Sequence, residues 1–309
     1  MGLAPRFAET DRPESAVVLD GGMSNVLEDL GHDLSEPLWT ARLLRDSPDA
    51  VAEVHRRYFR AGAQVATTAS YQASVPGFVA QGLSPNEAAT LLVRSVILAR
   101  EVRDELADNG AQRWVAASVG PYGAYLADGS EYRGRYGLSR AQLRDFHAPR
   151  LELLASAEPD VLAVETIPDV DEAEVLAGLL DDVALPAWFS FSSRGGRTAA
   201  GQPLGEALAL ASGVSCVVAV GVNCLPAGEV LDAVRTVRAV TDKPAVVYPN
   251  GGGRWDPASR TWTGEPGLDP SLARTWVAAG AGLVGGCCRV GPADIARLAT
   301  ATGADASGR

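Results

Sequence analysis

The chain has little lysine, few cysteines and few aromatic residues, and no long hydrophobic run. Of its 309 residues, 27 are Lys or Arg and 38 are Asp or Glu, and Lys243 is the one lysine, so the formal net charge is -11. A surface of that charge repels phosphate backbones, and we therefore expect no nucleic acid partner. No segment reaches the ~20 consecutive apolar residues of a membrane span, and the first residues lack the apolar core of a signal peptide. These absences favour a cytoplasmic protein with no membrane partner.

The cysteines are too few to hold together a disulfide-linked fold. The whole chain has 4, at positions 216, 224, 287 and 288. In the reducing cytoplasm a small group of cysteines indicates a metal site or a nucleophile. The remaining composition, 47% hydrophobic and 21% charged, is that of a globular protein with a large core.

Short apolar runs and amphipathic helical patterns alternate eight times along the chain. This alternation predicts parallel strands joined by right-handed crossovers, and eight such units close into an α/β fold, the (β/α)8 TIM barrel. A doubly wound open sheet is the alternative, but no GxGxxG motif follows the first strand. We expect one domain over residues 13–302, with flexible termini at 1–12 and 303–309. The expected strands are 17–19, 65–68, 114–118, 161–164, 187–191, 217–222, 245–248 and 283–285, and the expected helices are 48–61, 85–107, 140–156, 171–181, 204–212, 226–239, 270–279 and 293–300.

Two inserts rich in glycine and aromatic residues interrupt the alternation. They span residues 120–139, after the third strand, and 249–267, after the seventh strand. Long loops in a compact domain are more often lids or binding loops than ordinary surface loops. Both inserts are expected at the same end of the barrel.

Chemically distinctive residues follow several of the expected strands. A (β/α)8 barrel carries its active site at the C-terminal ends of its strands, so these residues are expected on one face. Cys224 comes from the sixth strand and Cys287 and Cys288 from the eighth, whereas Cys216 lies at the opposite end of the sixth. The other residues at the strand ends are Asp20, Gly21, Gly22, Ser70, Tyr71, Glu165 and Asn223.

Three neighbouring thiolates repel one another unless a cation neutralises them. A zinc ion with three protein ligands and one open position is the arrangement of a catalytic zinc site. His32 lies in a loop and His55 and His147 lie inside helices, so we do not expect them to be ligands. The alternative is that the cysteines are small buried core residues, because a CC pair without a CxxC partner is not a specific zinc signal.

An all-thiolate zinc site favours thiol chemistry over hydrolysis. Three thiolates weaken the Lewis acidity of the metal, which then activates water poorly. Such a metal can bind a fourth thiol and keep it as a nucleophilic thiolate, although the pKa of a free thiol is ~8.5. The expected reaction is alkylation of a thiol by a positively charged electrophile.

Seven stretches resemble the homocysteine S-methyltransferases, in the right order and across essentially the whole chain. The similarity is closest to the bacterial and plant branch that uses S-methylmethionine. It implies a zinc-dependent (β/α)8 barrel that makes methionine from homocysteine. The stretches are LDGGMSNVLEDLGHDLSEPLW (19–39), VHRRYFRAGAQVATTASYQAS (54–74), SVGPYGAYLADGSEYRG (118–134), VETIPD (164–169), GVNC (221–224), VYPNGG (247–252) and GGCCRVGPADI (285–295).

The resemblance implies a role for the cysteines and for two carboxylates. Cys224, Cys287 and Cys288 would hold Zn2+, and the homocysteine sulfur would take the fourth position. Asp20 and Glu165 match acidic residues that hold the homocysteine ammonium.

The resemblance also implies a pocket for the rest of the amino acid. The backbone amides of Gly21, Gly22 and Met23 would receive the homocysteine carboxylate, because glycine allows a close approach. Asn223 would orient the zinc ligands or the substrate. The chain departs from the family pattern at 24–26, where Ser-Asn-Val replaces a small residue, Thr, and Glu or Gln. We expect this change to alter the shape of the pocket and not the chemistry.

Aromatic residues are expected on the donor side, because the methyl groups of a sulfonium cation suit an aromatic face. Trp39 and Tyr71 match positions that line this side in the family, and Ser70 lies beside Tyr71. The first insert would help to close the site with Tyr122, Tyr125 and Tyr132.

Several alternatives stay open at this point. The donor could also be S-adenosylmethionine or betaine, and the acceptor could be selenocysteine. From other classes, the alternatives are a zinc hydrolase and a non-catalytic zinc-binding barrel. The expected partners are small-molecule substrates, homocysteine and a sulfonium methyl donor, and the sequence makes no prediction of the oligomeric state.

Overall fold

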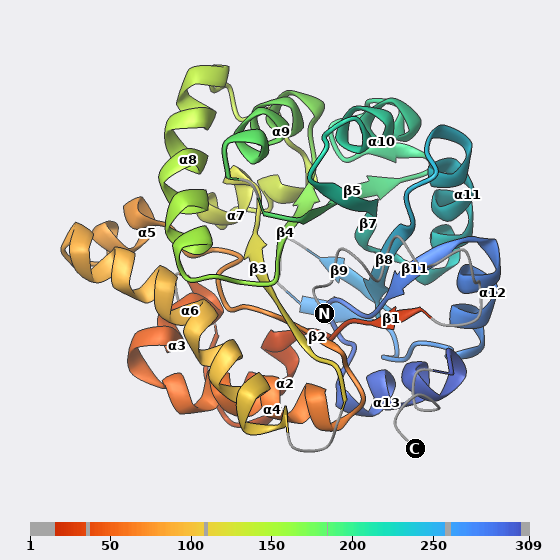
Figure 1. The fold of residues 1–309 in the computed structure, drawn as a ribbon, viewed down its shortest axis with the longest axis horizontal. Helices are drawn as coiled ribbons and strands as arrows, with labels where there is room; N and C mark the ends of the chain where they lie inside the picture. Colours follow the sequence, from red (N-terminus) through yellow and green to blue (C-terminus); the bar gives the residue numbers. More distant parts are fainter. Residues whose placement is uncertain (1–15, 35–37, 108–110, 184, 257–260, 304–309) are drawn as a thin grey trace.

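The computed structural model describes residues 16–34, 38–107, 111–183, 185–256 and 261–303 (Figure 1). The expected flexible termini, 1–12 and 303–309, lie outside the described residues apart from Gly303. Within the described part of the chain, no helix is both long and apolar enough to cross a membrane.

Eight parallel strands form the centre of the molecule, as the sequence predicts (Figure 1). Their order of pairing is β1, β11, β8, β7, β5, β4, β3, β2. A parallel bridge between Leu19 and Val65 joins the first strand to the second and closes the barrel. The strands are β1 (Val17–Val18), β2 (Val65–Thr67), β3 (Trp114–Val119), β4 (Val161–Ile167), β5 (Ala187–Arg194), β7 (Val217–Pro226), β8 (Ala245–Asn250) and β11 (Ala281–Val284).

Eight helices follow these strands and surround the barrel, in agreement with the alternation in the sequence. Their ends are set by local chemistry. At α6, for example, the Ser84 hydroxyl accepts from the Glu87 amide and the Glu87 carboxylate accepts from the Ser84 amide, which caps the first turn. The helices are α4 (Pro48–Arg60), α6 (Pro85–Glu105), α8 (Arg140–Ser156), α9 (Val170–Val183), α10 (Leu204–Ser212), α11 (Val230–Val240), α12 (Ser271–Ala279) and α13 (Pro292–Ala301).

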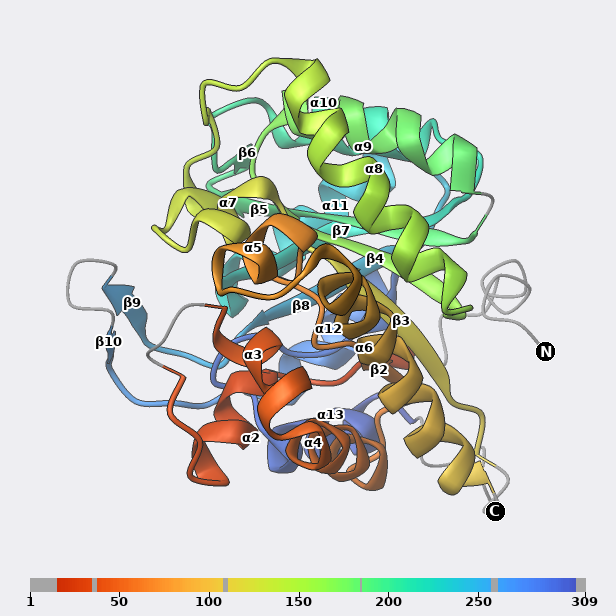
Figure 2. The same ribbon diagram turned by 90° about the vertical axis from the view of Figure 1, so that its left-hand side faces the viewer.

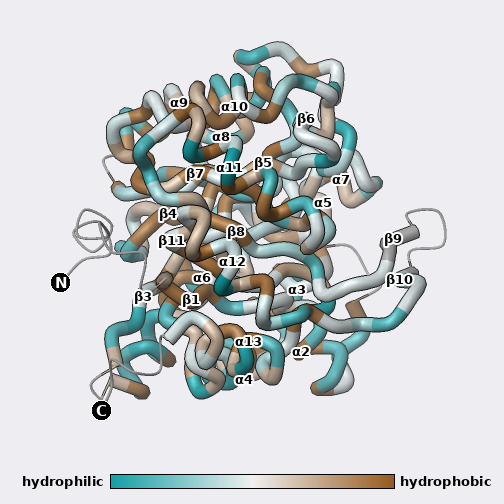
Figure 3. The backbone as a smooth tube through the Cα atoms, turned by 90° about the vertical axis from the view of Figure 1, so that its right-hand side faces the viewer, coloured by the Kyte–Doolittle hydropathy of each residue, from teal (hydrophilic) through white to brown (hydrophobic). Residues whose placement is uncertain are grey.

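Short extra elements that the sequence analysis did not anticipate lie between these units. The two inserts form a helix with a 3-10 turn and a β-hairpin, and in Figures 2 and 3 both lie on the same side of the barrel. The extra elements are α2 (Met23–Asp29), α3 (Trp39–Asp46), α5 (Val75–Ala80), α7 (Tyr122–Leu126), η2 (Ser130–Tyr132), β6 (Arg197–Thr198), η3 (Ala227–Glu229), β9 (Arg254–Asp256) and β10 (Thr261–Thr263).

Alternate residues of each strand face the barrel interior and the helices. The interior contains a compact apolar cluster that includes Trp114, Trp188 and Leu283. Residues between them on the strands, such as Val115 and Phe189, pack in a second and larger cluster with the helices. Because both faces of the strands are buried, the strands are mainly apolar, and polar residues such as Ser118 and Glu165 lie toward their C-terminal ends.

Candidate functional site

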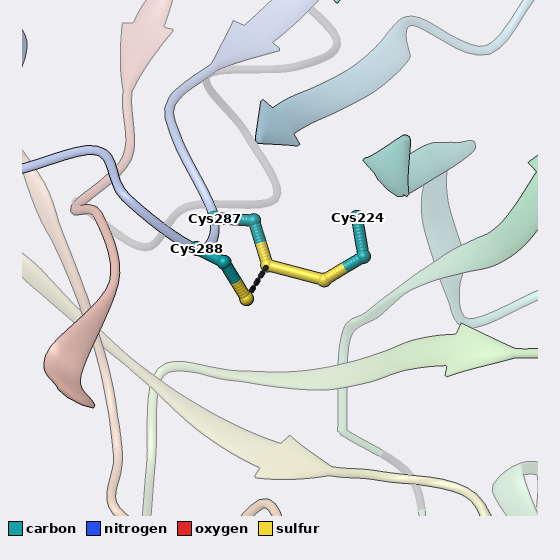
Figure 4. Close-up of side chains that lie close together, drawn as sticks. All are labelled: Cys224, Cys287 and Cys288. Atoms are coloured by element: carbon teal, nitrogen blue, oxygen red, sulfur yellow. Dashed lines mark hydrogen bonds between the residues drawn. A yellow bond between two sulfur atoms is a disulfide. The ribbon is translucent and has the colours of Figure 1, made fainter. Parts of the chain in front are cut away.

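Three cysteines meet at the C-terminal ends of β7 and β11, as predicted (Figure 4). Their Sγ atoms all lie within 4.8 Å of one another, and the Cys287 and Cys288 sulfurs are 4.0 Å apart. Cys224 and Cys287 are joined as a disulfide, and Cys288 is a free thiol. Each of the three cysteines is only partly buried. Cys216 lies apart from them, before β7, and packs against the core, as expected of a residue outside the site.

The donor set fits a soft metal ion once the disulfide is reduced. Tetrahedral bonds of about 2.3 Å to sulfur place neighbouring sulfurs about 3.8 Å apart, which is close to the Cys287–Cys288 separation of 4.0 Å. Among the described residues, no other group of three His, Cys, Asp or Glu side chains has a ligand geometry. Three sulfur donors and no fourth protein ligand leave one coordination position for a substrate thiol.

Backbone strain concentrates at this end of the barrel. Thr166, Cys224 and Arg289 are non-glycine residues in the left-handed region, with φ of 60°, 53° and 65°. Thr166 follows Glu165 directly, and Arg289 follows Cys288. This conformation is costly for a β-branched residue such as Thr166 and persists where surrounding contacts hold it, which is common at functional sites.

Gly21 and Gly22 pack directly against the loop that carries Cys287 and Cys288. A Cβ on Gly22 would lie 2.7 Å from the Cys287 carbonyl oxygen, and one on Gly21 would lie 2.4 Å from that of Val290. The Gly22 amide also donates to the Val290 carbonyl, at 3.0 Å. The Gly22 amide is therefore used within the protein in this structure, and the binding of a carboxylate by the amides at positions 21–23 stays a prediction. Glycine is needed at both positions for close packing of the cysteine loop.

The departure from the family pattern at 24–26 has a structural consequence at the cysteine loop. The Asn25 side-chain oxygen accepts from the Arg289 amide at 2.8 Å, and Arg289 is the residue after Cys288. The Arg289 guanidinium in turn donates to the Gly264 carbonyl and lies over the Trp262 ring in β10, 5.6 Å from the ring centroid. Asn25 and Arg289 thus tie the cysteine loop to α2 on one side and to the second insert on the other.

Asp20 lies at the end of β1 and is 6% exposed. Its two carboxylate oxygens accept from the Thr67 amide at 2.6 Å and from the Thr67 hydroxyl at 2.8 Å. Burial raises the pKa of Asp20 to about 7, the negative charge of Glu165 adds to the rise, and the two bonds from Thr67 oppose it. Asp20 and Glu165 are therefore close enough to repel each other when both are ionised.

Glu165 lies at the end of β4 and is 7% exposed. Its carboxylate accepts from the Ser118 hydroxyl and from the Tyr248 hydroxyl. Burial raises the pKa of Glu165, and these two hydrogen bonds reduce the rise. A cation placed between Asp20 and Glu165 would relieve the repulsion between them and offset the cost of burying two carboxylates.

Asn223 contacts the backbone next to Glu165 and not the sulfurs themselves. Its side-chain oxygen accepts from the Thr166 amide at 2.8 Å and from the Ser190 hydroxyl at 2.8 Å. Its amide nitrogen donates to the Thr166 hydroxyl at 2.6 Å. Asn223 thus holds Thr166 in its left-handed conformation and thereby fixes the direction of the Glu165 side chain.

The expected donor-side residues differ in their surroundings. Tyr71 is partly buried, whereas Ser70 is fully buried and donates to the Ser118 carbonyl at 2.7 Å. The buried Arg150 guanidinium donates to the carbonyls of Ser70, Tyr71 and Gly120 and so joins the loops after β2 and β3. The position of Ser70 supports a structural role in this loop. Trp39 begins α3, and its side chain lies outside the described residues.

The tyrosines of the first insert differ in their surroundings. The Tyr122 and Tyr125 rings pack on each other, with centroids 5.4 Å apart, and both pack on Phe146 of α8. Part of each ring surface is therefore used in packing, and the expectation that these two rings help to close the donor site stays a prediction. Tyr132 is the member of the group that interacts electrostatically with Cys288.

Sequence reasoning missed several residues that support the site. Thr67, Ser118 and Tyr248 orient the two carboxylates, and each lies on a strand near its C-terminal end. A rule that considers every polar residue at a strand end would have found them. Arg150 and Glu131 lie outside the barrel strands, and their burial could not be read from the sequence.

The histidines have no role as ligands among the described residues. His55 and His147 are fully buried, and burial lowers the pKa of His55 to about 4. His147 pairs with the buried Glu172 carboxylate at 2.8 Å. Both are structural residues, in line with the sequence analysis.

Known proteins are similar in sequence to this protein over nearly the whole chain. The family model described as "Homocysteine S-methyltransferase" matches residues 17–302. The chain is 46% identical to a homocysteine S-methyltransferase of Escherichia coli over 92% of this chain and 94% of that protein. It is 43% identical to homocysteine S-methyltransferase YbgG of Bacillus subtilis over 92% of this chain and 93% of that protein.

A solved structure has the same fold. The metallated form of the homocysteine methyltransferase MmuM from Escherichia coli superposes with a TM-score of 0.85 and 43% identity, over 96% of this chain and 99% of that one. The oxidised form of MmuM gives the same TM-score, identity and coverage. The chain therefore belongs to the homocysteine S-methyltransferase family and is a methyltransferase.

Proposed function

We propose that this protein transfers a methyl group from S-methylmethionine to the thiol of L-homocysteine, with Zn2+ held by Cys224, Cys287 and Cys288. The observation that carries the proposal is the convergence of three sulfurs within 4.8 Å from two strands of one barrel. When bound, zinc supplies a soft Lewis acid that favours loss of the proton from a thiol and keeps the sulfur nucleophilic at neutral pH. The three cysteines must be reduced for this, which agrees with a reducing, cytoplasmic setting.

The two buried carboxylates suit the homocysteine ammonium. Asp20 and Glu165 interact with each other, and each is already oriented by hydrogen bonds from the protein. A bound ammonium would favour the ionised form of both, since opposite charge lowers the pKa of a carboxyl group. We assign the homocysteine carboxylate to the amides of Gly21 and Met23, where the chain turns from β1 into α2.

Asn223 and Tyr71 complete the proposed pocket. Asn223 acts through Thr166 and keeps Glu165 aimed at the ammonium. Tyr71 provides an aromatic surface for the sulfonium methyl groups, and we propose the same for Trp39. Arg150 fixes the loop of Tyr71 by donating to its carbonyl at 2.7 Å.

The reaction needs no general base among the side chains. The homocysteine sulfur attacks the donor methyl carbon in line with its bond to the donor sulfur. A new carbon–sulfur bond forms, the old one breaks, and its electron pair returns to the donor sulfur, which loses its positive charge. Two neutral thioethers result, so the protein's main tasks are to align the two sulfurs and to exclude water.

Parallel assays with one acceptor and several donors test this proposal. Zinc-loaded protein and L-homocysteine are combined with S-methylmethionine, S-adenosylmethionine or betaine, and methionine is measured. We expect the highest kcat/KM with S-methylmethionine. Turnover with betaine alone would contradict the choice of donor, and zinc-independent turnover would contradict the assignment of the metal.

A further inference from the structure

Asn25 lies where the chain departs from the family pattern, and its side chain reaches the cysteine loop. It is the third residue of α2 and is partly buried. Its Oδ1 atom accepts a hydrogen bond from the Arg289 amide at 2.8 Å. A Cβ on Gly22 would lie 2.3 Å from this oxygen, so the Asn25 side chain folds back over the start of its own helix.

The Arg289 amide belongs to the peptide group that follows Cys288. This group is held from both sides, because its N–H donates to Asn25 and its carbonyl, that of Cys288, accepts from the Gly251 amide at 2.8 Å. A peptide group is planar, so the two bonds together fix the orientation of a plane that includes the Cys288 Cα atom. The Cα–Cβ bond that directs the Cys288 sulfur starts from this plane.

Neighbouring amides of the loop use backbone acceptors. The Cys287 amide donates to the Pro249 carbonyl at 2.8 Å, and the Val290 amide donates to the Cys287 carbonyl at 3.2 Å. Such acceptors remain when a side chain is replaced. The Arg289 amide depends on the side chain at position 25, so one substitution removes its bond and leaves the others in place.

The rest of Arg289 is held by the second insert. Two guanidinium nitrogens donate to the Gly264 carbonyl at 3.0 Å, and the guanidinium carbon lies 5.6 Å from the centroid of the Trp262 ring. The φ angle of Arg289 is 65°, in the left-handed region. A residue with a side chain keeps this conformation where surrounding contacts hold it, and Asn25 supplies the contact at the amide.

A metal site with three protein ligands depends on the exact placement of each of them. Zinc prefers a tetrahedral arrangement, and groups that orient its ligands typically change its affinity by about 10–100-fold when they are removed. The Cys288 sulfur lies 4.0 Å from that of Cys287, near the separation that a tetrahedral site requires. A rotation of the peptide group after Cys288 would move this sulfur out of place.

We infer that Asn25 is a positioning residue of the metal site, which holds the Arg289 amide, keeps Cys288 in ligand geometry and so sets how tightly the protein retains zinc. This inference rests on the proposed function. The departure from the family pattern then acts on the metal loop and not only on the shape of the amino-acid pocket.

The test compares the zinc affinity of Asn25→Ala, Asn25→Asp and wild type. Competition with a chromogenic chelator under reducing conditions measures the zinc dissociation constant of each folded protein. We expect it to rise about 10–100-fold in Asn25→Ala. Asn25→Asp keeps an acceptor oxygen and should weaken zinc binding by no more than about threefold. The control, Asn86→Ala, changes an exposed asparagine of α6 and should match wild type.

The pair of variants separates positioning of the ligand from general stability. A merely structural residue would lower the free energy of unfolding of the zinc-free protein, which urea unfolding measures, and leave the zinc affinity of the folded protein unchanged. Recovery of zinc affinity in Asn25→Asp ties the effect to the acceptor oxygen.

Hydrogen exchange keeps the inference testable if Asn25→Ala does not fold. Nuclear magnetic resonance follows the exchange of the Arg289 amide in wild type and in Asn25→Asp. We expect this amide to exchange at least about tenfold more slowly than exposed amides in both proteins, because its bond to position 25 must open first. An Arg289 amide that is unprotected in wild type would overturn the inference.

The remaining outcomes can be told apart. Wild-type zinc affinity in Asn25→Ala, or an equal loss in Asn25→Ala and Asn25→Asp, would overturn the role of Asn25 while zinc binding by wild type still supports the proposed metal. A reduced wild-type protein that binds no zinc would overturn the proposed function, and the inference with it.

Discussion

Replacing Asn223 with alanine tests whether this side chain holds the site together. The change removes three hydrogen bonds, to the Thr166 amide, the Thr166 hydroxyl and the Ser190 hydroxyl. The Ser190 hydroxyl keeps its hydrogen bond with Tyr248, and the Thr166 hydroxyl keeps its bond with Tyr71, so each of these two lost bonds costs about 0.5–1.5 kcal/mol. The buried Thr166 amide is left unsatisfied, which costs about 1–3 kcal/mol. Relief of the left-handed conformation of Thr166 returns about 1–2 kcal/mol. We therefore expect the free energy of unfolding to fall by about 2.5 kcal/mol, the middle of the resulting range.

The same change should weaken the binding of homocysteine. Glu165 follows the conformation of Thr166, so its carboxylate would lose its alignment toward the ammonium. Loss of one charge-assisted hydrogen bond corresponds to a rise of about tenfold or more in the homocysteine KM. Urea unfolding and steady-state kinetics measure the two effects, with the exposed Asn86→Ala as control. An Asn223→Ala protein with wild-type stability and an unchanged homocysteine KM would refute the role given to Asn223.

Three further predictions concern the charge and redox state of the site. Burial raises the pKa of Asp20 to about 7, so the ionised form that binds an ammonium predominates only above that pH. The kcat/KM for homocysteine should therefore fall about tenfold between pH 8 and pH 6. If the pH profile of Asp20→Asn keeps this step, the assignment is contradicted. Cys288→Ser should lose zinc and activity while its circular dichroism spectrum stays that of wild type. The control, Cys216→Ser, should keep its zinc and its activity. Metal analysis that finds full zinc in Cys288→Ser would show that Cys288 is not a zinc ligand. A mild thiol oxidant should join Cys224 to Cys287 and release zinc to a chromogenic chelator. Dithiothreitol with added zinc should then restore activity. Oxidation that leaves the zinc bound would show that these sulfurs do not hold it.

The regular part of the fold could be predicted from the sequence because its signals are local. Each barrel strand is a short apolar run, and each long helix carries an amphipathic pattern with a cap such as Ser84 or a terminal glycine such as Gly280. Short elements escaped prediction. A helix of the length of α5 (Val75–Ala80) is too short for its periodicity to stand out.

The metal ligands could also be predicted, because the C-terminal ends of barrel strands meet at one face wherever they lie in the sequence. The contacts between side chains could not. Two examples are the hydrogen bond from the Gly22 amide to the Val290 carbonyl and the hydrogen bonds of Asn223 with Thr166. Both depend on distances across the barrel mouth. The burial of Glu131 depends on how the first insert folds back over the strands, which no local pattern records.

Isotope-labelled transfer tests the central claim most directly. Zinc-loaded protein is given L-homocysteine deuterated on its carbon chain and S-methylmethionine with deuterated methyl groups, and the methionine products are analysed by mass spectrometry. We predict that the methionine with the homocysteine carbon chain carries one intact labelled methyl group, and that Cys224→Ser abolishes its formation. Doubly labelled methionine formed equally well by Cys224→Ser, or absent from the wild-type reaction, would contradict the account.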